Sequence, residues 1–459
     1  MKIVLINIVI NKILTHKKKI ILTILLLSGI IFSINYIITK KKIHHLFSHK
    51  QIQIAKKYIF PYKYISDLEL KISKLPNLEK ELYFKKNKKN ITVAKKKDIL
   101  LSNNQILKSY ILIEGFYTGI QNIYPGSGYI DYYQGNLFVI SARGTLAYAA
   151  NIENDLNFKQ IKNNIDDFIN FKHFKKDKSF SIKDIFIQDD KILVSYTEEI
   201  LEDCWNTSII YGDINYKKIQ FKKLFSTDQC IHSLKNVDRV FSAHQSGGKI
   251  INFDEKHILL SVGEYRNRFL AQDKESINGK IIKININNSS YEIISMGHRN
   301  PQGLYYDKLN NFILETEHGP KGGDEINLIE VDRINEHELL NYGWAIASKG
   351  EHYSGKKDVK TYQKYPLYKS HYDYGFIEPL KSFIPSVAIS EITKITNNRY
   401  VVGTMGDKSL YFFELDNEKK IINLERVKVF ERVRDLIFKD NNLYLFLEDT
   451  ASIGIINFD

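Results

Sequence analysis

Cysteine is nearly absent from this chain of 459 residues, which contains only Cys204 and Cys230. Neither lies beside a histidine or another cysteine at the spacing of metal ligands, so these cysteines give no zinc site. If the body of the protein is exported, a disulfide between the two is chemically permitted. Two unpaired thiols in a cytosolic protein are the alternative.

Acidic residues are scarce in the N-terminal fifth, and lysines crowd there at 17–19, 40–42 and 85–97, whereas the remainder is slightly acidic. The formal charge of +13 therefore arises from one end of the chain. No helical arginine stripe and no aromatic RNA-binding motif accompany these lysines. We exclude nucleic acid as a partner.

The uncharged apolar run Ile20–Thr39 has about the 20 residues that a membrane-spanning helix needs. No small-x-small cleavage site follows it, which favours a retained signal anchor over a cleaved signal peptide. Its all-round hydrophobicity disfavours a buried core helix. Basic residues flank both ends, so charge does not choose the orientation. We expect a basic segment at 1–19, a transmembrane anchor at 20–39 and a Lys-rich stalk at 40–91.

Beyond Ile91, short β-branched and aromatic runs alternate with Asn, Asp and Gly turns. A two-strand unit recurs there, and its first strands are NLFVIS at 136, KILVSY at 191, HILLSV at 257, NFILET at 311, RYVVGT at 399 and NLYLFL at 442. Six such units predict an all-β, six-bladed β-propeller over 92–459, with each unit as the innermost strand pair of a blade. A pair of β-sandwiches is the competing architecture, but radial closure protects sheet edges.

The segment Gly297–Trp344 is dense in glycine and charged residues. Its first motif, GHRNPQG, presents polar side chains from a turn that Gly and Pro make rigid. Arg299 in this turn is suited to be a forked donor to a carboxylate-bearing ligand. A structural arginine that ties two blades together is the alternative.

The next motif, HGPKGGDEIN, joins a Gly-Pro turn to Asp324 and Glu325. Calcium takes carboxylate and carbonyl oxygens, which this turn offers, so the motif is compatible with a calcium loop. It lacks the alternating acids of an EF-hand. Solvated acids on a blade turn are the alternative.

Two further positions carry candidate chemistry. His244 precedes two glycines in SAHQSGGKI, and a histidine near neutral pKa suits a general base. Arg432 and Arg434 stand two apart, so on a strand they share one face. Their mutual repulsion would be relieved by an anionic ligand, or by an acid such as Glu431 or Asp435.

Taken together, GHRNPQGL, EHGPKGGDEINLI and NYGW resemble the soluble glucose and sorbosone dehydrogenase family, aldose dehydrogenases that use pyrroloquinoline quinone (PQQ) and calcium. EPLKSFIPSVAIS at 378–390 and VVGTMGDKSLYFFEL at 401–415 are also similar to family motifs. The resemblance implies a six-bladed propeller. It also implies a quinoprotein enzyme that oxidises an aldose to its lactone by hydride transfer to PQQ.

By the matching motifs, the resemblance implies that His244 is the catalytic base and that Arg299 stabilises the developing anion. Arg299 and Asn300 would contact the quinone oxygens, and Arg432 and Arg434 would hold the PQQ carboxylates.

The resemblance also implies two calcium sites. Backbone carbonyls of Gly319 and Pro320 would bind the calcium that chelates PQQ. Asp324, Glu325 and Tyr342 match a second, structural site.

The chain departs from the family pattern at several positions. Gly406 stands where a lysine is usual, so Lys408 would have to reach the cofactor instead. Ala243 replaces an acid that precedes the base, and Phe383 replaces a tryptophan. The motif NGLLGxAFHP, which supplies a glutamine to the site, is missing.

The leading interpretation is an inner-membrane protein, anchored once, whose C-terminal body oxidises a sugar in the periplasm and passes electrons to an unknown acceptor. The rival is a catalytically degenerate propeller that binds a glycan or a partner protein. A lactonase-type hydrolase would need acidic calcium ligands in the channel, which the sequence does not show.

Overall fold

The computed structural model describes residues 75–87, 90–120, 126–155, 157–177, 179–238, 240–355 and 358–458. The chain divides into two compact units, Met1–Ser73 with Leu234–Arg239, and Lys74–Ser233 with Val240–Asp459. The second unit, called the body below, holds every element discussed here. Among the described residues no helix has the length and apolarity to cross a membrane. The predicted anchor at 20–39 lies outside the described residues.

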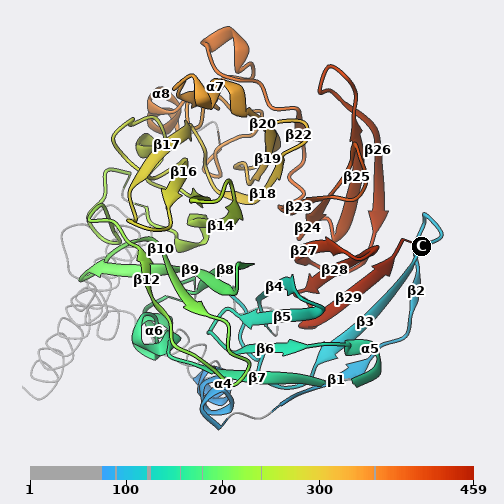
Figure 1. Cartoon of the computed structure of the whole chain (residues 1–459). Coiled ribbons are helices and arrows are strands. Elements are labelled where there is room, and N and C mark those ends of the chain that lie inside the picture. Colours follow the sequence, from blue (N-terminus) through green and yellow to red (C-terminus); the bar gives the residue numbers. More distant parts are fainter. Residues whose placement is uncertain are drawn as a thin grey trace, which may run out of the picture. The chain divides into compact units, whose positions relative to one another are not determined.

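The body consists mainly of antiparallel sheets that surround a common centre (Figure 1). The four-strand units, in chain order, are β4 (Gly128–Tyr133), β5 (Asn136–Ser141), β6 (Leu146–Ala149) and β7 (Asn157–Asn163); β8 (Ile182–Gln188), β9 (Lys191–Leu201), β10 (Cys204–Asp213) and β12 (Lys222–Phe225); β14 (Gly247–Asn252), β15 (His257–Val262), β16 (Lys280–Asn285) and β17 (Tyr291–Met296); β18 (Pro301–Asp307), β19 (Phe312–Glu317), β20 (Asp324–Glu330) and β22 (Lys381–Phe383); and β23 (Ile389–Lys394), β24 (Arg399–Thr404), β25 (Ser409–Leu415) and β26 (Ile421–Lys428).

Strands from the two ends of the body pair with each other. β27 (Val433–Lys439), β28 (Asn442–Leu447) and β29 (Ser452–Asn457) are completed by β3 (Ile106–Leu112), which lies antiparallel to β29. β1 (Ile91–Lys95) then links β3 to β7, so these two units form one continuous hydrogen-bonded sheet. This pairing removes two free edges, because the first and last parts of the body cover each other.

Short elements complete the body. They are the strands β2 (Ile99–Leu100), β11 (Lys218–Ile219), β13 (Ile231–His232) and β21 (Leu340–Asn341), and the helices α4 (Leu75–Asn87), α5 (Ile152–Asp155), α6 (Phe171–Lys176), α7 (Val331–Asn335) and α8 (Val359–Lys364).

The first strand of each unit faces the centre. β4, β8, β14, β18, β23 and β27 each contact the next, and β27 contacts β4. The all-β prediction is confirmed, and the arrangement is propeller-like. The recurring motifs, however, form the second and third strands of each unit, such as β5 with β6 and β24 with β25. The prediction that they are the innermost pair was therefore wrong.

The inner strands were missed because their pairing is irregular. Irregular register interrupts β8, β14, β18, β23 and β27, for example between Gly247 and Ile250 and between Val433 and Asp435. A bulge breaks the two-residue alternation on which strand recognition depends. The inner strands therefore carry the weaker sequence signal.

Buried aspartates connect neighbouring inner strands. Asp131 on β4 accepts a hydrogen bond from the Ile187 amide on β8 (2.6 Å), and Asp184 on β8 accepts one from the Ile250 amide on β14 (2.8 Å). Asp435 on β27 accepts one from the Ile130 amide on β4, at 2.8 Å. Because inner-strand edges would otherwise leave amides unpaired, these carboxylates fix the angular spacing of the units.

Helix α4 packs against the sheets although it falls within the predicted stalk at 40–91. Leu78 and Phe84 are buried in two core clusters. Glu81 is fully buried and accepts hydrogen bonds from Thr118 Oγ1 (2.6 Å) and Ser141 Oγ (2.7 Å). The structure therefore places this helix with the body, while the remaining domain limits stay predictions.

Cys204 and Cys230 form a disulfide, with their Cα atoms 5.3 Å apart. Cys204 begins β10, and the neighbouring Ile231 pairs with Trp205 through β13. The bond thus ties β13 to the third strand of its unit. The permitted disulfide, rather than the pair of free thiols, is what the structure contains.

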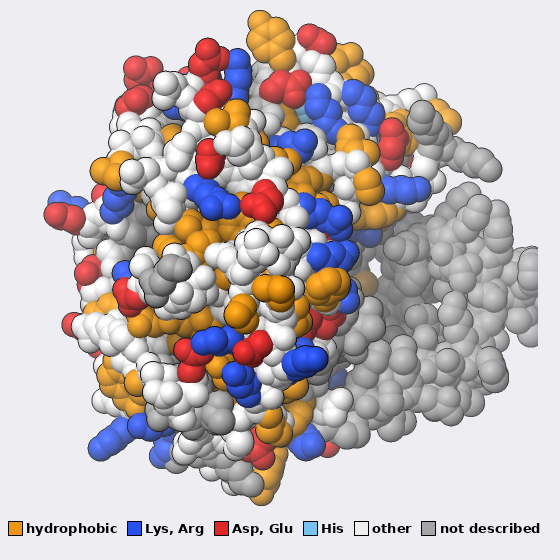
Figure 2. All heavy atoms as spheres, turned by 90° about the vertical axis from the view of Figure 1, so that its right-hand side faces the viewer, with side chains coloured by type: hydrophobic (Ala, Val, Ile, Leu, Met, Phe, Trp, Pro, Cys, Tyr) orange, Lys and Arg blue, Asp and Glu red, His pale blue; other side chains and the backbone are white. Residues whose placement is uncertain are grey.

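The face that bears β25 and β26 has no expanse of one charge sign (Figure 2). Arg426 pairs with Asp407 and Arg399 pairs with Glu425 on this part of the body. Acidic and basic side chains alternate there, so the charge excess of the sequence does not appear on this face.

Candidate functional site

A cavity of about 260 Å³ opens where the inner strands begin. It is lined by Ile120, Tyr129, Lys183, His244, Gln245, Ser246, Gly247, Arg299, Asn300, Gln302, His318, Tyr353, Ala388, Met405, Arg432 and Arg434. Five of the predicted site residues, His244, Arg299, Asn300, Arg432 and Arg434, are therefore brought together. Four side chains of this lining are basic and none is a carboxylate. An anion is the ligand that such a lining favours.

Arg432 and Arg434 converge on one buried acid, Glu448. Arg434 Nη2 lies 2.7 Å from Glu448 Oε1, and Arg432 Nε lies 2.9 Å from Glu448 Oε2. Burial opposes ionisation of Glu448, yet the two arginines hold its pKa below the usual range. One carboxylate therefore lies between two guanidinium groups at this wall. Of the alternative partners, Glu431 pairs with Lys96, and Asp435 accepts a hydrogen bond from the Ile130 amide.

Arg299, which also lines the cavity, is held by backbone and ring contacts. Its Nη1 donates to the His318 carbonyl at 2.7 Å, and its guanidinium carbon lies 5.4 Å from the centre of the Trp344 ring. With its amide suitably oriented, Gln245 accepts from Arg299 Nη2 (2.7 Å) and donates to Glu264 Oε1 (2.5 Å). The arginine is 5% exposed, so its fork is pre-oriented before any ligand arrives.

Asn300 lies next to Arg299 and is also nearly buried. Its Oδ1 accepts hydrogen bonds from the Gly247 amide (3.2 Å) and from Gln302 Nε2 (3.1 Å). Its carbonyl accepts one from the His318 amide, at 3.2 Å. These bonds fix the start of β18 against the loop that carries His244.

His244 lies on a short 3₁₀ turn, Ala243–Gln245, that precedes β14. Ser179 Oγ is 2.7 Å from its Nδ1 and 3.2 Å from its Nε2, so this hydroxyl orients the ring. Lys183 Nζ lies below, where it donates to the carbonyls of Ser179 (3.0 Å) and Ala243 (3.1 Å). Burial, reinforced by Arg434 and Arg143, lowers the pKa of Lys183 to about 7.

His318 completes the lining between the two arginine walls. Burial lowers its pKa to about 4, with the positive charge of Arg299, Arg434 and Arg432 acting in the same direction and Asp324 opposing it. Its Nε2 is buried and has no partner among the described residues. A neutral imidazole with an unsatisfied nitrogen in a cavity is a ligand-directed group.

The turn after His318 is organised by Asp324. Asp324 Oδ1 accepts from the Gly319 amide (3.0 Å) and Ser386 Oγ (3.0 Å), and Oδ2 accepts from the amides of Val387 (2.9 Å) and Ala388 (2.6 Å). The sequence predicted a calcium ligand here. In the structure these donors occupy the carboxylate, which shapes the turn bearing Gly319 and Pro320.

Gly319 and Pro320 directly follow His318, which lines the cavity. The Pro320 carbonyl accepts a hydrogen bond from Ser386 Oγ at 3.2 Å. A Cβ atom at Gly319 would lie 2.0 Å from the Gly323 carbonyl oxygen, so no other residue fits this turn.

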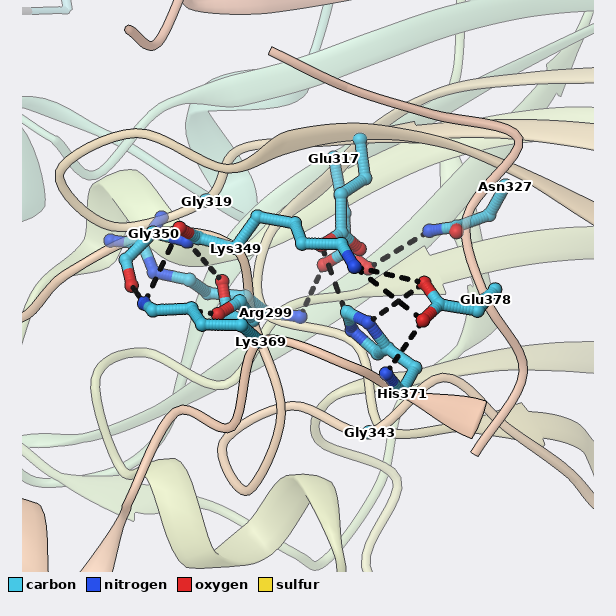
Figure 3. A network of polar contacts seen from close by, with 12 residues as sticks. Arg299, Glu317, Gly319, Asn327, Gly343, Lys349, Gly350, Lys369, His371 and Glu378 are labelled. Atoms are coloured by element: carbon cyan, nitrogen blue, oxygen red, sulfur yellow. Dashed lines mark hydrogen bonds and ion pairs between the residues drawn. The ribbon is translucent and has the colours of Figure 1, made fainter. Parts of the chain in front are cut away.

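Glu325 points to the other face of β20, away from Asp324, because successive strand residues alternate. Its Oε1 lies 3.7 Å from His371 Nε2. Figure 3 shows the surrounding network, in which His371 also approaches Glu378 and Lys349 pairs with Glu378. The Tyr342 hydroxyl donates to the Leu328 carbonyl at 2.7 Å. The proposed second calcium site thus lies outside the cavity lining.

Lys408 is not among the residues that line the cavity. Its Nζ pairs with Asp449 at 2.8 Å. At Gly406, where the family pattern has a lysine, a Cβ atom would lie 2.9 Å from the Val387 carbonyl oxygen. The backbone here is therefore shaped for glycine, and Lys408 serves a different contact in this structure.

The sequence did not single out Lys183, His318, Glu448 or Ser179 as site residues. Lys183 and Glu448 sit in or directly after ordinary strand patterns, with no glycine or proline nearby to mark them. His318 was within a recognised motif, but the motif drew attention to its carbonyl-rich turn. A buried charge becomes evident only once the strands are placed around the centre.

The model of the family described as Glucose / Sorbosone dehydrogenase matches residues 180–456. The aldose sugar dehydrogenase YliI of Escherichia coli (strain K12) is 25% identical over 257 residues, which cover 51% of this chain and 63% of that protein. The chain thus spans less than two thirds of this relative.

Solved structures show a similar fold. The apo-form of the soluble aldose sugar dehydrogenase of E. coli has a TM-score of 0.56 at 19% identity and covers 76% of this chain and 99% of its own. The PQQ-bound aldose sugar dehydrogenase of Streptomyces coelicolor has a TM-score of 0.53 at 16% identity, covering 76% and 98%. Since the family model covers more than half of the sequence and includes every predicted site residue, the chain belongs to the glucose/sorbosone dehydrogenase family.

Proposed function

We propose that this protein is a PQQ- and calcium-dependent dehydrogenase that oxidises an aldose to its lactone, on a six-bladed β-propeller. The observation that carries the proposal is the cavity wall, in which Lys183, Arg299, Arg432 and Arg434 converge without a lining carboxylate. PQQ bears three carboxylates and a quinone, which match forked cationic donors. The fold likeness and the family membership agree with this chemistry.

The residues present fit such a cofactor. Arg432 and Arg434 both bind Glu448 and line the cavity, where their forked donors would bind carboxylates. Arg299 and Asn300 would face the quinone oxygens, and the unpartnered His318 Nε2 would donate to or accept from the same ligand. When bound, PQQ would serve as the acceptor of a hydride from the anomeric carbon of the sugar.

His244 would take the proton of the anomeric hydroxyl. Its ring is oriented by Ser179, and it lines the same cavity as Arg299, which would face the cofactor. Arg299 would stabilise negative charge that develops on the acceptor oxygen.

Calcium would be bound by the carbonyls of Gly319 and Pro320, in the turn that Asp324 holds rigid. Glu325 and Tyr342 would form a second, structural site. Lys408 would reach the cofactor only after its contact with Asp449 opened.

We further propose that 20–39 anchors the protein in the inner membrane with the body in the periplasm. The disulfide between Cys204 and Cys230 supports this side, because such bonds persist in oxidising compartments. Alkaline phosphatase fused after Lys57 should then be active. An inactive fusion that is stably expressed would place this segment in the cytoplasm.

The direct test of function is titration of the full-length protein with PQQ in the presence of calcium, followed by dye-linked oxidation of aldoses. We expect binding at micromolar PQQ or tighter, and a loss of at least about 10-fold in Arg299→Lys, which keeps the charge but not the fork. Arg399→Lys, whose arginine pairs with Glu425 at 3.3 Å, is the matched control. No binding at micromolar PQQ would contradict the proposal.

A degenerate propeller that binds a glycan or a partner protein is the second candidate. The engagement of Lys408 by Asp449 and the glycine backbone at 406 favour it. Glycan binding that persists without PQQ and survives His244→Ala would support this candidate over the enzyme.

A further inference from the structure

A second polar cluster lies inside the unit that contains β18 to β20, buried away from the cavity. Glu315 and Glu317 occupy one face of β19, and Asn327 and Glu325 stand directly opposite them on β20. His298 closes the cluster from the segment before β18. Each of these five residues is exposed by 5% or less.

The charges of this cluster are unbalanced. Like charges placed directly across a strand pair destabilise a sheet, and Glu317 lies opposite Glu325. Among the described residues, the ion pairs of Glu315, Glu317 and Glu325 are made only with histidines. Glu315 Oε1 and Asn327 Oδ1 are buried without any partner. Glu317 Oε2 accepts a hydrogen bond from the Arg299 amide at 2.5 Å, and Asn327 Nδ2 donates to Glu315 Oε2 at 2.9 Å. In the described part of the chain, however, no lysine or arginine side chain pairs with these three buried carboxylates.

The ligand atoms are close enough for one ion. His298 Nδ1 lies 3.3 Å from Glu317 Oε1 and 4.0 Å from Glu315 Oε2. On a tetrahedral zinc ion with bonds of about 2.0–2.2 Å, neighbouring ligand atoms are roughly 3.3–3.6 Å apart. His298 Nδ1 and Glu317 Oε1 already have this separation. His298 Nδ1 and Glu315 Oε2 would have to approach by only about half an ångström.

The surroundings of His298 suit a metal ligand. Its Nε2 lies 2.9 Å from Ser295 Oγ, which can accept the N–H and leave the Nδ1 lone pair directed at the carboxylates. Such a partner on the far nitrogen fixes the tautomer of a ligating imidazole. The Tyr342 ring stacks on the imidazole, with centres 4.9 Å apart.

We propose that His298, Glu315 and Glu317 form a buried structural site for a divalent transition-metal ion such as zinc. One imidazole nitrogen and two carboxylates favour zinc over calcium, which prefers oxygen ligands alone. Asn327 Nδ2 lies 2.9 Å from Glu315 Oε2, so turning this amide would offer its oxygen as a fourth ligand. None of the three ligands lines the cavity, although Glu317 Oε2 accepts a hydrogen bond from the amide of the cavity residue Arg299 at 2.5 Å. The proposal does not depend on the proposed PQQ chemistry.

A proton is the competing occupant. Burial and the adjacent Glu317 raise the pKa of Glu315 well above its usual range, so a protonated acid would also relieve the repulsion. The two occupants differ in what the protein retains on dialysis. Only the metal site predicts stoichiometric zinc.

The test uses full-length protein stripped of metal and dialysed against micromolar Zn²⁺, with metal content measured by mass spectrometry. We expect one zinc per chain, and an affinity at least about 100-fold weaker in Glu315→Gln, which keeps the shape but removes the charge. Glu338→Gln, which alters an exposed acid paired with Arg333, should retain the ion. Glu325→Gln should also retain it. No zinc in the wild type, or zinc lost with Glu325→Gln but kept with Glu315→Gln, would overturn the proposal.

A second measurement does not depend on variants. Crystals of the wild-type protein equilibrated with Zn²⁺ should show a zinc-edge anomalous peak bonded to His298 Nδ1 and to both carboxylates. A peak elsewhere, or none, contradicts the site even if Glu315→Gln fails to fold.

Discussion

Arg434 and Glu448 form a buried ion pair, with Nη2 and Oε1 2.7 Å apart, at the wall of the central cavity. Arg432 binds the other oxygen of the same carboxylate, at 2.9 Å from Nε. The acid therefore orients both guanidinium groups. If the proposed cofactor binds, its carboxylates and Glu448 would act together as counter-charges of these arginines.

Glu448→Gln should destabilise the ligand-free protein. Removing one partner of a buried pair leaves uncompensated charge and costs about 3–5 kcal/mol in the free energy of unfolding. An anion that binds the two arginines should restore part of the loss. Urea unfolding with and without PQQ measures both effects.

Glu418→Gln provides the comparison for this prediction. Glu418 pairs with Lys420 on the surface, so its replacement should change stability by no more than about 0.5 kcal/mol. Equal destabilisation by both substitutions would show that Glu448 has no special role in holding the arginines.

Lys183 should make stability depend on pH. Burial lowers its pKa to about 7 in the folded protein, below the value of 10.5 for an exposed lysine. Below pH 7 the ammonium is charged in both states, and its burial cost is fully present. Between pH 7 and 10.5 the folded state releases the proton while the unfolded state keeps it, so stability rises with pH.

Lys183→Met should remove the part of this rise that Lys183 contributes, as measured by urea unfolding from pH 6 to 10. Burial also lowers the pKa of Lys280 to about 7. Because Lys280 is present in both proteins, the difference between their curves isolates Lys183. Parallel curves would mean that Lys183 remains protonated through its contacts with the carbonyls of Ser179 and Ala243.

The sequence predicts the strands whose apolar residues alternate regularly and misses those whose alternation is broken. β24 and β28 were recognised at their observed limits because their apolar residues alternate without interruption. The inner strands carry bulges, so the same criterion assigned the inner position to the wrong strands. Helix α4 lies in the Lys-rich segment that was expected to be a stalk, and the burial of Leu78 and Phe84 shows that it packs on the body.

The site residues that the sequence predicted are likewise those that lie in distinctive motifs. His244, Arg299 and Asn300 lie in turns that glycine or proline makes conspicuous, and the structure gathers them with Arg432 and Arg434 in one cavity. Glu448 and Lys183 are single charges beside apolar runs, which carry no local mark. Their role depends on the closure of the ring, a relationship between distant residues that no short motif encodes.

The disulfide should stabilise the body independently of the cavity. Cys204 and Cys230 are 26 residues apart, and closing a loop of this length constrains the unfolded chain by about 3.5 kcal/mol. Cys204→Ser should lower the free energy of unfolding by this amount under oxidising conditions. Under reducing conditions wild type and variant should unfold alike, and a difference that persists would assign the effect to packing of the sulfur instead.

His244→Ala should separate binding from chemistry. Ser179 orients this imidazole, whereas the arginines lie on other walls, so PQQ affinity should stay within about twofold while dye-linked sugar oxidation falls about 10²- to 10⁴-fold. His257→Ala removes a histidine that pairs with Asp254 on an exposed turn, and it should leave the rate unchanged. The contrary result would be weaker PQQ binding with unchanged turnover of the bound enzyme, which would make His244 a cofactor ligand. The base would then be another residue of the cavity, and His318 would be the first to replace.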